Sequence, residues 1–144
     1  MAQTIWKEAA LEWTNNCSLH VYDPSIGAYR LIASLDEAKK LIKHSSEPFI
    51  RTIAAVYAFS LTAMHSTYTE IEIFTAKLER EARQFKKWLA YSPLVVELFD
   101  RLLETSKKSQ SINGIKTDIY HEAIRLSIQL EDRFDIKENL KRQA

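Results

Sequence analysis

The sequence predicts an α+β fold that is predominantly α, in which an N-terminal β-hairpin packs on a bundle of about four to five helices. The 144 residues include two glycines and three prolines, too few for the many turns of an all-β protein. Apolar residues recur every three or four positions along most of the chain, which is typical of the buried face of a helix. One N-terminal segment alternates instead, as a half-buried strand does.

The length and composition predict a single globular domain that covers residues 1–144. Hydrophobic residues make up 46% of the chain and charged residues 27%, close to the average of globular proteins. Two halves of this chain would each be too small for a good core. We expect the hairpin at about 17–33 and the helical bundle at about 35–140.

The N-terminal third contains a short helix and then the hairpin. Apolar residues share one face of a helix at about 3–13, namely Ile5, Trp6, Ala9 and Trp13. The strands are indicated by Cys17, Leu19 and Val21 before a loop at 23–27, and by Tyr29, Leu31 and Ala33 after it. Proline and glycine in that loop favour a turn. A two-stranded hairpin is marginal alone, so we expect it to pack on helices or to pair with another strand.

Capping residues mark the starts of the next two helices. Ser34 and Glu37 form a capping box, and Pro48 suits a first helical turn. The helix predicted at 48–64 is apolar nearly all round, which is typical of a central helix or of an oligomer interface. Arg51 is its one charged residue, and we expect it to form a structural ion pair.

Polar residues divide the C-terminal half into three helices. Residues 65–69 offer capping side chains, and we expect a break there between helices at 48–64 and 69–91. Ser92 and Pro93 begin another helix as its N-cap and first residue. Residues 109–117 form the clearest polar loop. The last helix is predicted to begin at about Asp118.

The sequence lacks the familiar signatures of a cofactor site. Phosphate-binding loops need clustered glycines, and the chain has only Gly27 and Gly114. We therefore expect no cofactor, no catalytic residues of a familiar kind, and a protein that is more readily a non-enzyme than an enzyme. Dispersed residues could still converge in space, which leaves an enzyme of unfamiliar type as an alternative.

Metal binding is not expected either. A carboxylate-bridged site in a helix bundle needs two Glu-x-x-His pairs, and Asp118 with His121 supplies one approximate half-site. The other histidines, His20, His44 and His65, show no ligand spacing. Cys17 is interpreted as a small strand residue rather than a nucleophile.

One helical segment carries a cluster of basic residues, which we predict as the partner-binding surface together with Trp88. Its cations are Lys77, Arg80, Arg83 and Lys87. Glu79 with Arg83 and Lys77 with Glu81 stand at i,i+4, so an ordinary ion-paired surface is the competing interpretation. The net charge is +1, which gives no general attraction to nucleic acid.

These features together predict a non-enzymatic intracellular interaction or regulatory protein. It would self-associate, as a dimer, through its apolar helices, or bind another protein. Nucleic-acid binding through the basic helix is the alternative that is not favoured. No membrane association is expected, because 48–64 is shorter than the ~20 residues of a bilayer span. The N-terminus lacks a secretory signal, so we predict a cytoplasmic location.

The first 82 residues resemble a small uncharacterised α+β family of bacterial genomes. The resemblance rests on the strand pair, the Ser34–Ala38 cap, the helix end at Ala63–Met64, and the motifs 74–76 and 81–82. The spacing at 65–72 departs from that pattern. The family has no established chemistry, so the resemblance implies no catalytic residues.

Overall fold

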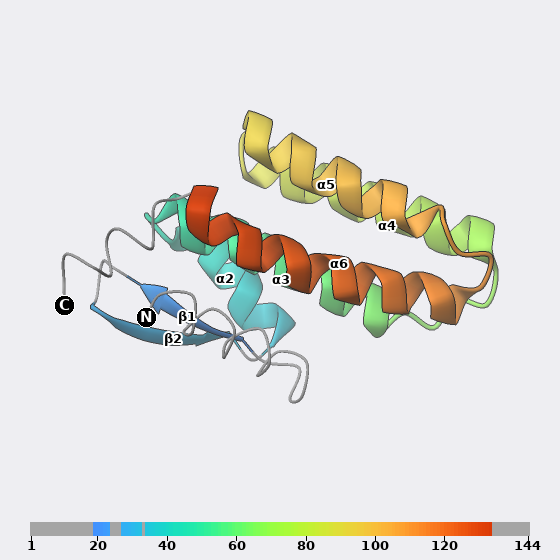
Figure 1. Cartoon of the computed structure of the whole chain (residues 1–144), viewed down its shortest axis with the longest axis horizontal. Helices are drawn as coiled ribbons and strands as arrows, with labels where there is room; N and C mark the ends of the chain where they lie inside the picture. The colour runs from blue at the N-terminus through green and yellow to red at the C-terminus, as the bar shows by residue number, and fades with distance from the viewer. Residues whose placement is uncertain (1–18, 24–26, 33, 134–144) are drawn as a thin grey trace.

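The computed structural model describes residues 19–23, 27–32 and 34–133 (Figure 1). The predicted N-terminal helix with Trp6 and Trp13, the Cys17 position and the end of the chain beyond residue 133 lie outside the described residues. The backbone of the two strands is described, but the side chains of His20, Tyr22 and Tyr29 are not.

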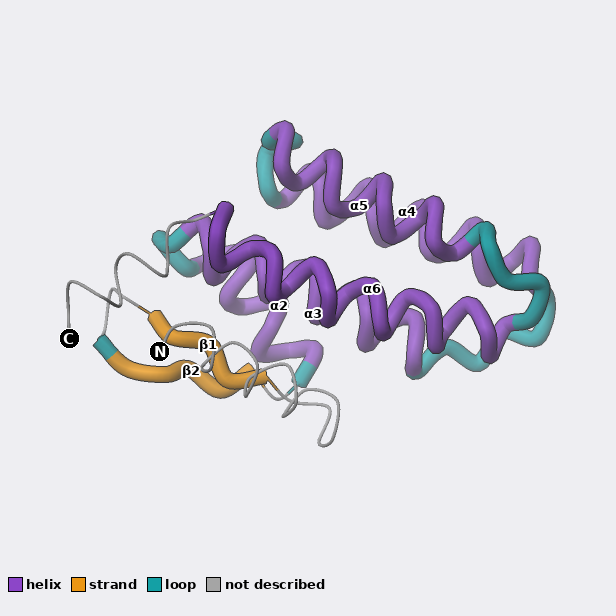
Figure 2. The backbone as a smooth tube through the Cα atoms, in the orientation of Figure 1, coloured by secondary structure: helices purple, strands orange, loops and turns teal. Residues whose placement is uncertain are grey.

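Five helices make up most of the described chain. They are α2 (Leu35–His44), α3 (Pro48–Met64), α4 (Ile71–Trp88), α5 (Pro93–Ser106) and α6 (Ile112–Arg133). Figure 1 shows α3, α4, α5 and α6 running in alternating directions, and Figure 2 shows the short turns that join them. Short connections favour antiparallel neighbours, as in an up-and-down bundle. Helix α2 lies on the outside of α3.

Helix α3 is the centre of the core. It contacts α2, α4 and α6, and its residues from Thr52 to Leu61 are all buried. This explains why its sequence is apolar nearly all round. Much of the apolar surface of α3, from which self-association was predicted, is thus buried within the chain.

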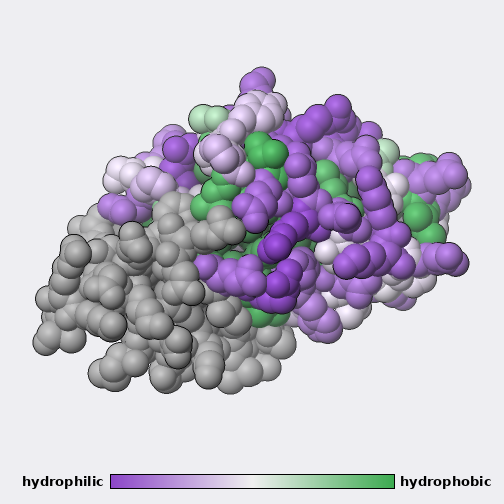
Figure 3. Space-filling view, turned by 45° about the horizontal axis from the view of Figure 1, so that its top comes forward, coloured by the Kyte–Doolittle hydropathy of each residue, from purple (hydrophilic) through white to green (hydrophobic). Residues whose placement is uncertain are grey.

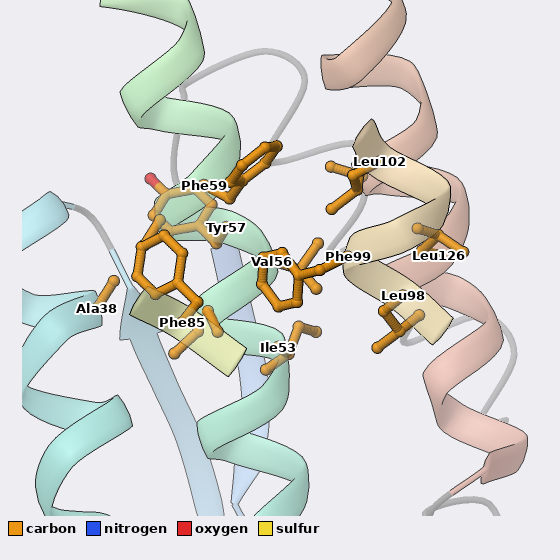
Figure 4. Packing of buried hydrophobic residues seen from close by; sticks show 14 of the residues in the cluster. Ala38, Ile53, Val56, Tyr57, Phe59, Phe85, Leu98, Phe99, Leu102 and Leu126 are labelled. Atoms are coloured by element: carbon orange, nitrogen blue, oxygen red, sulfur yellow. The ribbon is translucent and has the colours of Figure 1, made fainter. Parts of the chain in front are cut away.

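Three phenylalanines link α3, α4 and α5 (Figure 4). The ring centroid of Phe99 lies 5.6 Å from that of Phe59 and 5.7 Å from that of Phe85. Phe59 and Phe85 are 6.5 Å apart in an edge-to-face arrangement. Such pairs add to the stabilisation that burial already gives. Leu98 and Leu102 of α5 also point toward α3 in Figure 4.

Two short strands precede the helices. β1 (Leu19–Asp23) and β2 (Ala28–Ile32) are antiparallel, with Leu19 opposite Ile32 and Asp23 opposite Ala28. Gly27 has a φ of 64°, a left-handed conformation that glycine adopts without strain. Ile32 is fully buried and joins the helical core.

The predicted α+β class is wrong, because the described fold is mostly α. The elements that contact each other most are pairs of helices. Each of the two strands makes most of its contacts with the other strand. Two strands are too few for a layer on which helices could pack. The hairpin contributes Ile32 to a core that is otherwise built mainly from residues of the helices.

The predicted helix starts are mostly confirmed. The Ser34 hydroxyl accepts a hydrogen bond from the Glu37 N–H at 3.2 Å, and the Ser92 hydroxyl accepts one from the Val95 N–H at 3.3 Å. The break after residue 64 is also confirmed, since α4 begins at Ile71. The start at Asp118 is wrong. Helix α6 begins at Ile112, and the Ser111 hydroxyl accepts from the Gly114 N–H at 3.0 Å, so part of the polar run is the cap and first turn.

Candidate functional groove

An open groove of about 580 Å³ lies where α3 and α5 begin. One wall is the first turn of α3, and the other is the first turn of α5 with the α4–α5 turn before it, which Figure 2 shows as a short loop. The lining residues are Pro48, Arg51, Thr52, Leu89, Ser92, Pro93, Leu94, Val95 and Glu97. We call this cavity the α3–α5 groove.

Arg51 connects three helices at the groove wall. Its Nε donates to the Ile42 carbonyl at 2.8 Å, and its Nη2 donates to the Trp88 carbonyl at 2.7 Å. Both acceptors lie in the last turn of their helices, α2 and α4, where carbonyl groups lack helical partners. The predicted ion pair of Arg51 does not form among the described residues. Within the described residues Arg51 bonds to backbone carbonyls, because these two helix ends converge on it.

The electrostatics of the groove follow from this arrangement. A cation is stabilised by the negative ends of two helix dipoles, which here are those of α2 and α4. Among the described residues, the Nη1 group of Arg51 has no hydrogen-bond partner. Glu97 is the acidic residue of the lining.

The α4–α5 turn beside the groove is strained. Ala90 has a φ of 59° and Tyr91 a φ of 52°, a left-handed conformation that is costly for residues other than glycine. The turn is held by the Tyr91 N–H, which donates to the Lys86 carbonyl at 2.8 Å. Strain of this kind is stored where the surrounding structure dictates the backbone.

The structure divides the predicted partner-binding residues. Arg80, Arg83 and Lys87 are all exposed on the outer face of α4. Lys77 lies to one side of them and forms an ion pair of 2.8 Å with Glu81. Lys86, on the opposite side, pairs with Asp100 of α5 at 2.7 Å, and its side chain is 13% exposed. The expected i,i+4 pair between Glu79 and Arg83 does not form in the described structure.

Trp88 belongs partly to the core. Its ring packs edge-to-face against Phe85, with centroids 5.6 Å apart. The ammonium group of Lys43 from α2 lies 4.8 Å from the centre of the indole ring, within the range of a cation–π interaction. Sequence spacing places Trp88 next to the basic residues of its own helix but gives no sign of Lys43, because that contact joins α2 to α4.

The remaining sequence-predicted groups do not assemble into a site in the described structure. No group of three or more His, Cys, Asp or Glu residues there could hold a metal ion, and Asp118 with His121 remains a half-site on α6. The hydrogen bond that the Arg125 guanidinium donates to the Glu122 carboxylate is the main cause that raises the pKa of Arg125, which lies on α6 away from the groove lining. None of the described helices is long and apolar enough to cross a membrane.

The chain is similar to part of an enzyme. No family model matches it. It is 31% identical over 134 residues to the methylthioribose-1-phosphate isomerases of Geobacillus thermodenitrificans and Geobacillus kaustophilus, a match that covers 88% of this chain and 35% of each relative. The enzyme of the same name from Bacillus pumilus is 32% identical over 84 residues, which is 56% of this chain and 23% of that relative. The chain thus spans about a third of the length of the relatives it matches.

This similarity corrects two predictions. The expected non-enzymatic interaction protein is wrong, because the three relatives are named as an enzyme and none as an interaction or nucleic-acid-binding protein. The resemblance to known proteins is real, but the relatives are methylthioribose-1-phosphate isomerases and not the uncharacterised bacterial family that the capping and core motifs suggested. Such motifs are shared by many helical proteins and could not distinguish the two.

Proposed function

We propose that this chain is a ligand-binding helical domain of the methylthioribose-1-phosphate isomerase type, and that the α3–α5 groove receives a phosphorylated sugar. The observation that carries the proposal is the similarity to these isomerases along 88% of the chain. Because the chain spans about a third of each relative, we assign the groove a binding role and assign no residue a catalytic one.

The chemistry of the groove supports this ligand class. Its volume of about 580 Å³ suits a small molecule. Arg51 lines one wall, and guanidinium groups are well matched to phosphate oxygens. Leu89, Leu94 and Val95 supply apolar surface. A ligand with a phosphate at one end and an apolar methylthio group at the other matches both kinds of wall.

Titration of the chain with methylthioribose-1-phosphate tests the proposal. We expect saturable binding by calorimetry, with amide shifts in a nitrogen–proton NMR spectrum centred on Thr52, Leu94 and Val95. Methylthioribose without its phosphate should bind more weakly, because it cannot pair with Arg51. Inorganic phosphate should compete. Shifts confined to residues outside the groove, or no saturable binding, would contradict the proposal.

A pair of leucine variants gives a control that leaves Arg51 intact. Leu94→Trp narrows the groove, because Leu94 lines it and is half-buried. Leu103→Trp makes the same change at a half-buried leucine of α5 that does not line the groove. We expect Leu94→Trp to weaken binding by about tenfold or more, and Leu103→Trp to leave it nearly unchanged. Circular dichroism checks that both variants fold.

The cellular setting of this function remains a prediction. A cytoplasmic location, a protein partner and a homo-oligomer each follow from the sequence alone.

Isomerase activity is measured in the same samples by following methylthioribose-1-phosphate by proton NMR for conversion to an isomer. Turnover by the isolated chain would assign it a catalytic role beyond the binding proposed here.

A further inference from the structure

We propose that the outer face of α4 binds an acidic segment of a partner protein. The surface consists of Arg80, Arg83 and Lys87 of α4, with Trp88 and Lys43 at its edge; we call it the basic face. This inference does not depend on the α3–α5 groove or on the isomerase proposal, because no residue of the basic face lines the groove.

Arg80, Arg83 and Lys87 of the basic face have no acidic partner in the described part of the chain. Among the described residues no carboxylate forms an ion pair with Arg80, Arg83 or Lys87, although Glu79 stands four residues before Arg83. The two other lysines of the helix are paired, Lys77 with Glu81 and Lys86 with Asp100. The helix therefore neutralises the cations on its flanks and leaves those on its outer face to solvent.

The spacing of the three cations matches a helical or extended acidic ligand. Positions 80, 83 and 87 follow an i, i+3, i+7 pattern, which places them in a row about 10 Å long on one side of a helix. Carboxylates at the same spacing on a partner helix would meet them in register. The arginines can each form two parallel hydrogen bonds with a carboxylate.

The edge of the basic face adds an aromatic contact. Trp88 is half-buried, and the Lys43 ammonium over its indole ring adds a fourth cation from a second helix. Tryptophan and arginine are the residue types most often found at energetic centres of protein interfaces. An acidic partner that reaches this edge would contact two helices rather than one.

Protein is favoured over nucleic acid as the partner. The net charge of the chain is +1, far from the basic bias of nucleic-acid-binding domains. Figure 3 shows one face of the molecule, on which hydrophilic residues surround smaller hydrophobic areas.

Fluorescence anisotropy with defined probes tests the proposal. The main probe is a labelled alanine-based peptide of about twenty residues, long enough to be partly helical, with glutamates at three- and four-residue spacing. A second peptide carries glutamine in place of every glutamate, and a single-stranded DNA oligonucleotide is the third probe. We expect the acidic peptide to bind at low salt, to weaken as salt is added, and to bind more tightly than either control.

Charge reversal locates the binding surface. The variant with Arg80→Glu, Arg83→Glu and Lys87→Glu should weaken peptide binding by about tenfold or more, and the corresponding glutamine variant should have an intermediate effect. The matched control carries Arg101→Glu, Lys107→Glu and Lys108→Glu, three exposed cations of α5 and its C-terminal end. It has the same net charge as the first variant and should retain binding.

Three results would overturn the inference. The acidic peptide could fail to bind at low salt. Both triple variants could lose binding equally, which would reflect net charge rather than this surface. The DNA probe could bind more tightly and depend on the same three cations, which would assign the basic face to nucleic acid. Circular dichroism shows whether each variant remains folded, and the glutamine variant replaces the glutamate variant if the latter does not.

Discussion

Arg51 shows how one residue can organise a site. A charge in an apolar helix must find a partner or reach solvent, and this much the sequence predicts. The partners are carbonyl oxygens of Ile42 and Trp88, which no local pattern identifies because Trp88 lies 37 residues further along the chain. The same side chain donates to carbonyls at the ends of two helices and lines the groove.

Replacing Arg51 should therefore destabilise the fold as well as alter the groove. Arg51→Met removes two hydrogen bonds from a charged donor, each contributing about 1.5–3 kcal/mol, and leaves two carbonyls without that partner. We expect the free energy of unfolding to fall by about 3 kcal/mol or more in urea denaturation. Arg51→Lys keeps the charge but not the guanidinium group that donates to both carbonyls. The free energy of unfolding should therefore fall less than in Arg51→Met. The exposed-site control Arg83→Met should change stability by less than about 0.5 kcal/mol.

The helix boundaries were predictable to the extent that local signals set them. Ser34, Pro48 and Ser92 mark helix starts because their side chains or rings suit a first turn whatever the rest of the fold does. The start of α6 was missed because the serines at 109 and 111 read as loop residues, although Ser111 caps the helix. The basic face was predictable from spacing along one helix. The groove was not, because it joins segments about forty residues apart.

The α4–α5 turn is the element whose conformation the sequence least predicts. Its two left-handed residues are alanine and tyrosine, whereas glycine or asparagine would normally signal such a turn. Long-range packing of Leu89 and Val95 against the core holds the turn in place.

Two alanine-to-glycine variants distinguish the strain at Ala90 from the ordinary effect of glycine inside a helix. Ala90→Gly relieves a left-handed conformation that costs roughly 1–2 kcal/mol, against an entropy cost of roughly 0.5–1 kcal/mol. We expect a net gain in stability of about 0.5–1 kcal/mol. Ala76→Gly, at an exposed position inside α4, should instead cost about 1 kcal/mol. The two variants are compared by thermal and urea unfolding, and a loss of stability on Ala90→Gly would show that the turn is not strained.

At the scale of the whole molecule, one continuous core joins elements that are distant in the sequence. Buried residues run from Ile32 of β2 through α3 to Leu130 of α6, and α3 contacts helices on three sides. The three-and-four periodicity predicted which residues face inward but not which helices would contact one another. Those contacts depend on how the helices pack, which no local pattern along the chain records.

A core of this kind predicts that the described helices unfold as one cooperative unit. Phe99 of α5 contacts Phe59 of α3 and Phe85 of α4, and Phe99→Ala should lower the free energy of unfolding by about 3–5 kcal/mol. If the unit is cooperative, amide hydrogen exchange should show the same decrease in the free energy of opening at the most protected amides of the other helices. Examples are Ile42 of α2 and Ala123 of α6. Leu103→Ala, at a half-buried position of α5, should cause a smaller loss shared in the same way. Protection of α2 that stays unchanged in Phe99→Ala would show that α2 and α5 belong to separate folding units, and it would contradict the single domain predicted for residues 1–144.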